Sequence, residues 1–261
     1  MIHGALQIFI CTSILASGCS SNGSDNGPTG PSSVTIGAQV TSPGSVTINS
    51  PTFPEPTVTQ IQGMYAQFAN EVRVTIDGPG VTLHSNGIPD HPSPYFGTGH
   101  SRYEAPHDGM SINPNIIVEQ NLVIQVPTAP DYATPGDTPM GPIGLAVNGV
   151  VLFNQYAAMR QPLTFEIESF DRYNGHPAPG GEYHYHLEPL WLTASSQSRL
   201  IGVLLDGFPV YGPEDSHGQV PSDLDVCHGH VSATMDFPSG IYHYHVGETP
   251  PYIAGCFRGT P

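Results

Sequence analysis

Lysine is absent from this chain of 261 residues, and its six basic residues are all arginines. Against 22 acidic residues they leave a formal net charge of −16. Nucleic acid binding depends on clusters of lysine and arginine that neutralise phosphates, so this balance argues against a nucleic acid partner and favours cations. Without lysine the chain also cannot form a Schiff base with a carbonyl substrate.

Two common catalytic patterns are absent as well. There is no G-x-S-x-G motif and no glycine-rich phosphate loop between a strand and a helix, so nucleophilic catalysis has little support. Beyond residue 20 no long apolar run has helical period, whereas 30 glycines and 28 prolines are typical of turns and short strands. Hydrophobic residues make up 38% of the chain, enough for a packed core. We therefore expect a mainly β protein, a single compact domain of short strands and many turns.

The first 19 residues carry an apolar run from Ala5 to Leu15, followed by three small residues and Cys19. The run is too short to span a bilayer but suits the hydrophobic region of a secretory signal. Residues 1–19 resemble a bacterial lipoprotein signal, which implies that Cys19 is lipidated and begins the mature protein. Ordinary cleavage and secretion is the alternative. In both cases the mature protein works outside the cytoplasm, in the periplasm or at the cell surface.

Residues 20–56 are rich in Ser, Gly, Asn, Thr and Pro, which is typical of a flexible tether. We expect this tether to lift a domain of residues 57–261 off a membrane. A lipid anchor would be the only link between that domain and the membrane.

The pairing of the cysteines depends on this compartment. If Cys11 leaves with the signal and Cys19 is lipidated, only Cys227 and Cys256 remain. Two cysteines in an oxidising compartment most simply form a disulfide. The alternative is that Cys227 is a thiolate metal ligand, which would leave Cys256 unpaired.

The second half of the chain contains an internal repeat. The block IGLAVNGVVLFN is followed by FDRYNGH and then by the tetrad YHYH, and IGVLLDGFPVYG, LDVCHGH and a second YHYH follow in the same order. The two copies span residues 143–186 and 201–245. Two copies are too few for a solenoid, so we expect one domain with internal pseudo-twofold symmetry.

Turn dipeptides predict where the chain reverses. Asn148-Gly149 and Asp206-Gly207 lie between apolar runs, which predicts a β-hairpin at the start of each copy. Earlier in the chain, residues 71–87 alternate on both sides of a Gly-Pro-Gly turn and predict another hairpin. Residues 115–127 predict one or two further strands, and residues 154–163 predict a short helix that Pro162 would end.

The alternation of tyrosine and histidine in each tetrad separates two faces of a strand. Successive side chains point to opposite faces, so His184 and His186 share one face while Tyr183 and Tyr185 share the other. Two residues along a strand are roughly 6.6 Å apart, a span that two imidazoles can close onto one ion. His243 and His245 repeat this arrangement in the second tetrad. Each tetrad therefore predicts one packing face and one metal-binding face.

A third candidate ligand precedes each tetrad. His176 and His230 each follow a glycine, which we expect to bend the backbone and aim the imidazole at the tetrad. Asp171 and Asp225 lie five residues earlier and could accept a hydrogen bond from the histidine nitrogen that does not bind the ion. Each copy would then form a site of three histidines with an open fourth position, which suits copper or zinc. His228 is an additional candidate in the second copy.

Other interpretations of the histidines are available. A histidine pair on a strand often lies on a solvated face, and imidazoles and phenols can satisfy one another in a hydrogen-bonded core network. His91 and His107 in the first half could complete a metal site, or they could belong to turns in which Asp and Asn cap their own backbone.

Several segments resemble a known family: SNGIPDHP (85–92), INPN (112–115), LDGFPVYGP (205–213), both tetrads, and PPYIAGCFRG (250–259). They are similar to the YHYH-domain family of extracytoplasmic, mostly bacterial proteins, over about residues 72–259. The family has no settled activity, so the resemblance implies a compartment rather than a reaction. Its members often carry a cysteine near the position of Tyr173 or Asn174 and another after the first tetrad, and this chain has neither. The retained Cys227 and Cys256 agree with a disulfide in the second copy.

Three functions are compatible with these observations. The first is an extracytoplasmic protein that binds copper or zinc for sequestration or delivery. The second is a metal-dependent oxidase or hydrolase that uses an open coordination position. The third is a cell-surface interaction module whose tetrads are structural. Metal ions are the expected partners in the first two, and the sequence identifies no protein partner.

Overall fold

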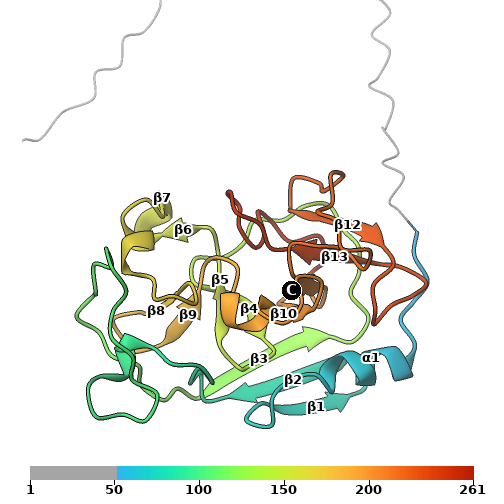
Figure 1. Cartoon of the computed structure of the whole chain (residues 1–261). Coiled ribbons are helices and arrows are strands. Elements are labelled where there is room, and N and C mark those ends of the chain that lie inside the picture. The colour runs from blue at the N-terminus through green and yellow to red at the C-terminus, as the bar shows by residue number, and fades with distance from the viewer. Residues whose placement is uncertain (1–51) are drawn as a thin grey trace, which may run out of the picture. The chain divides into compact units, whose positions relative to one another are not determined.

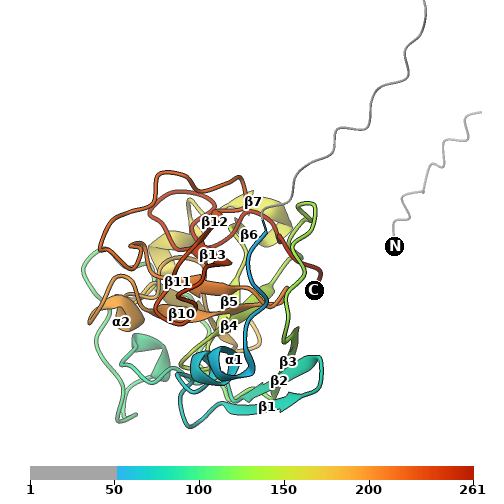
Figure 2. The same ribbon diagram turned by 90° about the vertical axis from the view of Figure 1, so that its right-hand side faces the viewer.

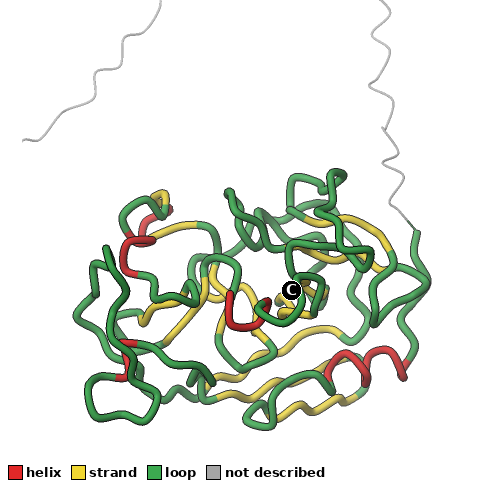
Figure 3. The backbone as a smooth tube through the Cα atoms, in the orientation of Figure 1, coloured by secondary structure: helices red, strands yellow, loops and turns green. Residues whose placement is uncertain are grey.

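Short strands are joined by long loops, as Figure 3 shows, in keeping with the many glycines and prolines of the chain. In the computed structural model, residues 52–261 are described, and they form one compact unit (Figure 1). The signal of residues 1–19, Cys19 and most of the 20–56 tether lie outside the described residues. The regular structure in the described part of the chain consists of sheets of three, eight and two strands, two short α-helices and three 3₁₀ turns. The expectation of a mainly β domain is confirmed.

The three-stranded sheet contains β1 (Arg73–Asp77), β2 (Gly80–Ser85) and β3 (Leu122–Pro127) in that order, all antiparallel. The predicted hairpin around Gly-Pro-Gly is confirmed by the β1–β2 pair. On β2 every second residue is buried, because one face of the sheet packs against the rest of the molecule. Of the one or two strands expected from residues 115–127, only β3 forms.

Helix α1 (Val58–Tyr65) lies beside this sheet in both views (Figures 1 and 2). Thr57 accepts a hydrogen bond from the backbone N–H of Gln60, and the Gln60 side chain accepts one from the backbone N–H of Thr57. This capping box satisfies two backbone donors at the start of the helix. Ile61, Met64 and Tyr65 are buried in the core. Within residues 52–261, no helix has the length and apolar character needed to cross a membrane.

The eight-stranded sheet is built from the two repeats. Its strands lie in the order β12–β13–β11–β10–β4–β5–β9–β8. In the first repeat these are β4 (Pro142–Ala146), β5 (Val151–Phe153), β8 (Gly175–Pro177) and β9 (Tyr183–Tyr185). In the second they are β10 (Leu200–Leu204), β11 (Pro209–Tyr211), β12 (Gly229–Ser232) and β13 (Ile241–His245).

The two halves of this sheet have the same topology. Each begins with an antiparallel hairpin, β4–β5 or β10–β11, and the tetrad strand pairs in parallel with the second strand of the hairpin. The strand with the Gly-His pair then lies antiparallel to the tetrad strand at the outer edge. The halves meet where β4 and β10 pair antiparallel. The predicted hairpins and the internal pseudo-twofold symmetry are confirmed.

The helix expected over residues 154–163 does not form. The segment instead contains β6 (Tyr156–Ala157), a 3₁₀ turn (Ala158–Arg160) and β7 (Gln161–Pro162), which pairs antiparallel with β6. The Asn154 side chain accepts a hydrogen bond from the Tyr156 N–H, and Met159 and Arg160 have positive φ. A side chain that binds its own backbone and two left-handed residues are incompatible with a helix. The remaining short elements are 3₁₀ turns at Pro94–Phe96 and Glu166–Ser169 and helix α2 (Leu190–Thr193).

Candidate metal centres

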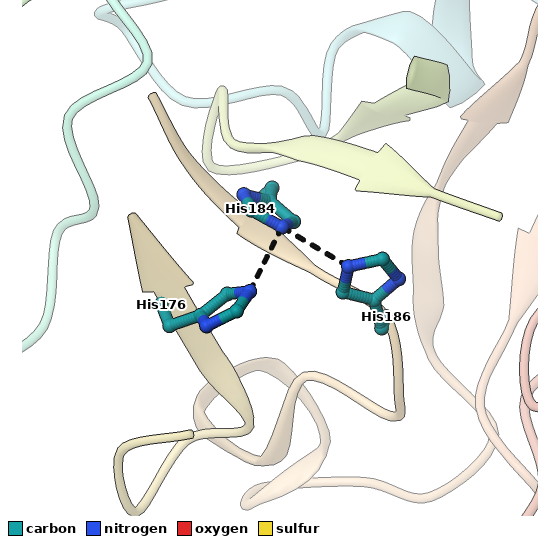
Figure 4. A group of neighbouring side chains, drawn as sticks. All are labelled: His176, His184 and His186. Carbon is teal, nitrogen blue, oxygen red and sulfur yellow. Dashed lines mark hydrogen bonds between the residues drawn. The ribbon is translucent and has the colours of Figure 1, made fainter. Parts of the chain in front are cut away.

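Three histidines from two neighbouring strands meet in each repeat. In the first, His176 on β8 lies directly opposite His184 on β9, and His186 follows the end of β9 (Figure 4). In the second, His230 on β12 lies opposite His243 on β13. The register therefore places the Gly-His histidine on the same face of the sheet as the tetrad histidines. We call the two groups the first centre (His176, His184, His186) and the second centre (His230, His243, His245).

The ligand atoms in each centre are close enough to share one ion. In the first centre, His184 Nε2 is 3.1 Å from the Nε2 atoms of both His176 and His186 (Figure 4). All three ligand atoms in each centre lie within 4.8 Å of one another. Nitrogens held at about 2.0–2.1 Å from a tetrahedral ion are roughly 3.3 Å apart, and two of the three nitrogen separations in the first centre are close to this value. These are the two histidine groups of this kind among residues 52–261.

The Nδ1 atoms of the first centre face hydrogen-bond acceptors. His184 Nδ1 lies 3.1 Å from the carbonyl oxygen of Glu182, and His186 Nδ1 lies 2.6 Å from that of Asn154. His176 Nδ1 lies 2.7 Å from the Ser169 hydroxyl, which itself donates to the Glu166 carbonyl and so accepts from the imidazole. A neutral imidazole carries one proton, and these acceptors favour Nδ1 as its position in each histidine.

Each Nε2 atom of the first centre then carries a lone pair, and the three lone pairs point toward one another. With the protons on Nδ1, two Nε2 atoms 3.1 Å apart repel each other, because neither nitrogen has a proton to donate. A shared cation removes this repulsion. The residues of the first centre thus fit a metal ion through their own hydrogen bonding.

The second centre has the same Nδ1 contacts, but its His230 Nε2 lies 3.1 Å from the Ser232 hydroxyl. His243 Nδ1 donates to the Ile241 carbonyl at 3.0 Å and His245 Nδ1 to the Gly212 carbonyl at 2.7 Å. His230 Nδ1 donates to the Asp223 carboxylate at 2.8 Å. The Nε2 atom of His245 is buried and has no hydrogen-bond partner. A metal ion would supply that partner.

Burial lowers the pKa of all three histidines of the first centre and of His243 and His245 in the second. His176, His184 and His186 are 4%, 2% and 2% exposed, and His243 and His245 are each 1% exposed. Burial, with a smaller contribution from His186, lowers the pKa of His176 to about 3, and burial lowers that of His186 to about 4. Burial first and neighbouring histidines second lower the pKa of His243 to about 3. Neutral imidazole is the form that binds metal.

The tyrosines of the tetrads lie on the opposite face, as the alternation predicted. Tyr183 and Tyr185 are fully buried and pack edge to face, with ring centroids 5.6 Å apart. Tyr242 and Tyr244 do the same at 5.2 Å. Each tetrad strand therefore contributes its tyrosines to the core.

The two aspartates contact these tyrosines instead of the histidines. Asp171 accepts a hydrogen bond from the Tyr183 hydroxyl at 2.7 Å, and Asp225 accepts one from the Tyr242 hydroxyl at 3.0 Å. Each also accepts from backbone N–H groups of the turn that follows it. The expectation that they contact the histidines is wrong, because both aspartates lie on the face of the sheet that carries the tyrosines. The Nδ1 atoms of His176 and His230 contact Ser169 and Asp223 instead.

The glycines before His176 and His230 do not have the role expected from the sequence. Gly175 and Gly229 lie in extended strands without a bend. A Cβ at Gly175 would lie 2.3 Å from the Tyr183 ring, and a Cβ at Gly229 would lie 2.4 Å from the Tyr242 hydroxyl. The glycines therefore make room for the first tyrosine of the tetrad.

Three other candidate histidines lie outside both centres. His91 is buried, with Nε2 2.8 Å from the Tyr185 hydroxyl and Nδ1 2.8 Å from the Pro92 carbonyl. His107 lies between the carbonyl oxygens of Asp108 and Phe170, and His228 donates from Nδ1 to the His245 carbonyl. His91 thus realises the imidazole–phenol network considered above, with both ring nitrogens occupied.

Glu166 is a site residue that the sequence analysis missed. Its Oε1 lies 3.6 Å from His176 Nε2, and its Oε2 is buried without a hydrogen-bond partner. Burial raises the pKa of this carboxyl. Glu166 and all three histidines of the first centre line one pocket of about 380 Å³. No spacing rule connects Glu166 with the tetrad, because the 3₁₀ turn Glu166–Ser169 that positions it has no distinctive sequence.

A disulfide joins Cys227 to Cys256. Cys227 is therefore not a thiolate ligand, and the disulfide predicted from the compartment is confirmed. It fixes the turn that leads into β12 and His230. At the corresponding place in the first repeat, Tyr173 packs against His91 and Trp191, with ring centroids 4.5 and 5.4 Å apart.

A model of the family described as YHYH protein matches residues 123–221 and 214–259. These matches cover more than half of the chain and include both centres and the disulfide. The chain belongs to the YHYH protein family. No curated protein and no solved structure matches the chain. The paired tetrads that the family is named for are therefore, in this chain, the strands that bring the histidines together.

Proposed function

We propose that this YHYH protein is an extracytoplasmic metal-binding protein, lipid-anchored through Cys19 at the end of a 1–19 signal, with residues 20–56 as tether. Each centre binds one transition metal ion, copper or zinc, for sequestration or delivery. The observation that carries the proposal is the convergence of three histidines in each centre, whose Nδ1 atoms face hydrogen-bond acceptors of the protein.

The surroundings of the centres support a cation. A chain with a net charge of −16 attracts cations from solution. Three imidazoles suit zinc and copper among the common metals, and the affinity order of divalent ions favours copper where it is available. Hydrogen bonds from Nδ1 to carbonyl and carboxylate oxygens raise the basicity of the ligands and fix the rings.

Metal analysis of the purified mature protein tests this proposal. We expect about two equivalents of copper or zinc, with one lost in the His184→Ala/His186→Ala variant and the other in the His243→Ala/His245→Ala variant. His91→Ala is the matched control, since His91 is a buried histidine outside both centres. A fully folded wild type that stays metal-free in excess copper and zinc contradicts the proposal and favours the third function, an interaction module with structural tetrads.

A metal-dependent oxidase or hydrolase is the second candidate function. The observation that favours it is Glu166, a carboxylate beside His176 Nε2 in a pocket shared with all three histidines. A bound ion with an open position would polarise a substrate or activate water. Glu166 would then orient the reacting group, and the apolar side chains of the pocket would exclude bulk water.

A further inference from the structure

The two centres differ in where their carboxylate lies. Counting back from the third histidine, Ser169 and Asp223 occupy the same position, and both hold the Nδ1 atom of that histidine. Three residues earlier, Glu166 in the first repeat corresponds to Val220 in the second. The first centre thus has a carboxylate near the metal-binding side of its third histidine, and the second has one on the opposite side.

The pocket beside the histidines is also larger at the first centre than at the second. The pocket of about 380 Å³ at the first centre touches all three histidines, and its walls are mostly apolar, with Met140, Phe153, Tyr156 and Pro177 among them. The pocket at the second centre that touches both His243 and His245 has a volume of about 10 Å³. A space of that size holds about one water molecule. A pocket of about 520 Å³ lies nearby, but of the second centre it touches only His245.

The open pocket and the carboxylate together define a ligand. A molecule that reaches the ion would place an oxygen at the fourth coordination position and its body against Phe153 and Met140. Glu166 Oε2 has no hydrogen-bond partner in its buried position, so it would accept a hydrogen bond from an N–H or O–H next to that oxygen. A simple carboxylate anion has no such donor.

We propose that the first centre is the ligand-binding centre of this protein and that it takes a small carbonyl compound with an adjacent N–H or O–H donor, such as an amide or a hydroxamic acid with an apolar body. The second centre holds its ion without an exogenous organic ligand. This inference rests on the proposed function, because the carbonyl oxygen binds to the metal ion of the first centre.

Benzohydroxamic acid and Co²⁺ make the inference testable without an enzyme assay. The protein is loaded with Co²⁺, and the visible absorption bands of the ion are followed as benzohydroxamic acid is added. We expect a saturable band shift in the His243→Ala/His245→Ala variant, which retains the first centre, and none in the His184→Ala/His186→Ala variant. Acetohydroxamic acid, which lacks the aryl body, is expected to bind several-fold more weakly because it buries less apolar surface.

Glu166→Gln separates the role of the carboxylate from that of the fold. We expect the variant to keep its Co²⁺ and to bind benzohydroxamic acid roughly tenfold more weakly, since the neutral amide oxygen of glutamine is a weaker acceptor than the carboxylate. Val220→Ala is the matched control in the second repeat and is expected to leave binding unchanged.

Two results overturn the inference. One is a stoichiometric Co²⁺ complex of the first centre whose bands do not respond to benzohydroxamic acid, and the other is an equal response of both centres. Failure to bind Co²⁺, Cu²⁺ or Zn²⁺ at all contradicts the proposed function instead, so the two failures are distinguishable.

Discussion

The residue before the third histidine shows how little space separates the core from the centres. Gly175 lies against the ring of Tyr183, whose hydroxyl donates to Asp171. The next residue, His176, points to the opposite face and into the first centre. A change at Gly175 therefore acts on the tyrosine and the histidine together.

Gly175→Ala is expected to destabilise the protein by about 1–3 kcal/mol, because the added Cβ would lie 2.3 Å from the Tyr183 ring. The shift of β8 should also weaken metal binding at the first centre and leave the second unchanged. Urea unfolding and metal competition measure the two effects. Gly180→Ala is the control, since nothing lies within 4 Å of its Cβ position. Equal stability of the two variants would contradict the steric role of Gly175.

At the scale of elements, the repeats stabilise the strand that carries the third histidine in different ways. In the second repeat the Cys227–Cys256 disulfide fixes the turn before β12, and in the first repeat Tyr173 packs against His91 and Trp191 before β8. The disulfide restricts the unfolded chain, whereas the aromatic cluster contributes only in the folded state.

Replacing both cysteines with serine should lower the free energy of unfolding by about 3–4 kcal/mol, the chain-entropy value for closing a loop of this length. Because Cys227 lies three residues before His230, the second centre should lose metal affinity while the first keeps its own. Denaturant unfolding and metal titration of each single-centre variant measure this difference. An equal loss of affinity at both centres would show that the disulfide acts on the whole domain.

The elements that could be predicted from the sequence are those with a local cause. The hairpins at Asn148-Gly149 and Asp206-Gly207 could be predicted because both dipeptides form turns, and each glycine takes the positive φ that the turn needs. Helix α1 was not predicted, although Thr57 and Gln60 form the Thr-x-x-Gln pattern of a capping box. A helix of eight residues has too few turns to give a clear apolar period.

At the scale of the whole molecule, the buried histidines make the free energy of unfolding depend on pH. Burial lowers the pKa of His176 and His243 to about 3 and that of His186 and His245 to about 4, whereas a histidine in the unfolded chain has a pKa of about 6.5. Between these values the unfolded chain binds more protons than the folded chain. The stability that these neutral histidines contribute is therefore fully present above about pH 6.5 and falls as the pH decreases towards 4.

We expect the metal-free protein to lose up to about 1.4 kcal/mol per pH unit for each of these histidines within that window. Urea unfolding at several pH values between about 7.5 and 4.5 measures the slope. The His176→Asn/His243→Asn variant should give a shallower profile, because asparagine does not titrate. A wild-type stability that stays constant across the window contradicts the neutral, buried state of the histidines.

The candidate site could be predicted in part. The alternation of the tetrads and the repeated Gly-His pair identified the six histidines that the structure brings together. The partners of those histidines could not be predicted, because Ser169, Asp223 and Glu166 contact them through the register of separate strands and turns. Sequence distance alone suggested Asp171 and Asp225, whose side chains lie on the other face of the sheet.

The order of the eight strands places β8 and β12 at the two outer edges of the sheet, and each carries a third histidine. The other two histidines of each centre come from the neighbouring tetrad. The ion of each centre would therefore link one edge strand to the neighbouring tetrad strand, so that both edges of the sheet are held. Unpaired edge strands are where separate chains join into aggregates, so occupancy of the centres would also protect the protein from self-association.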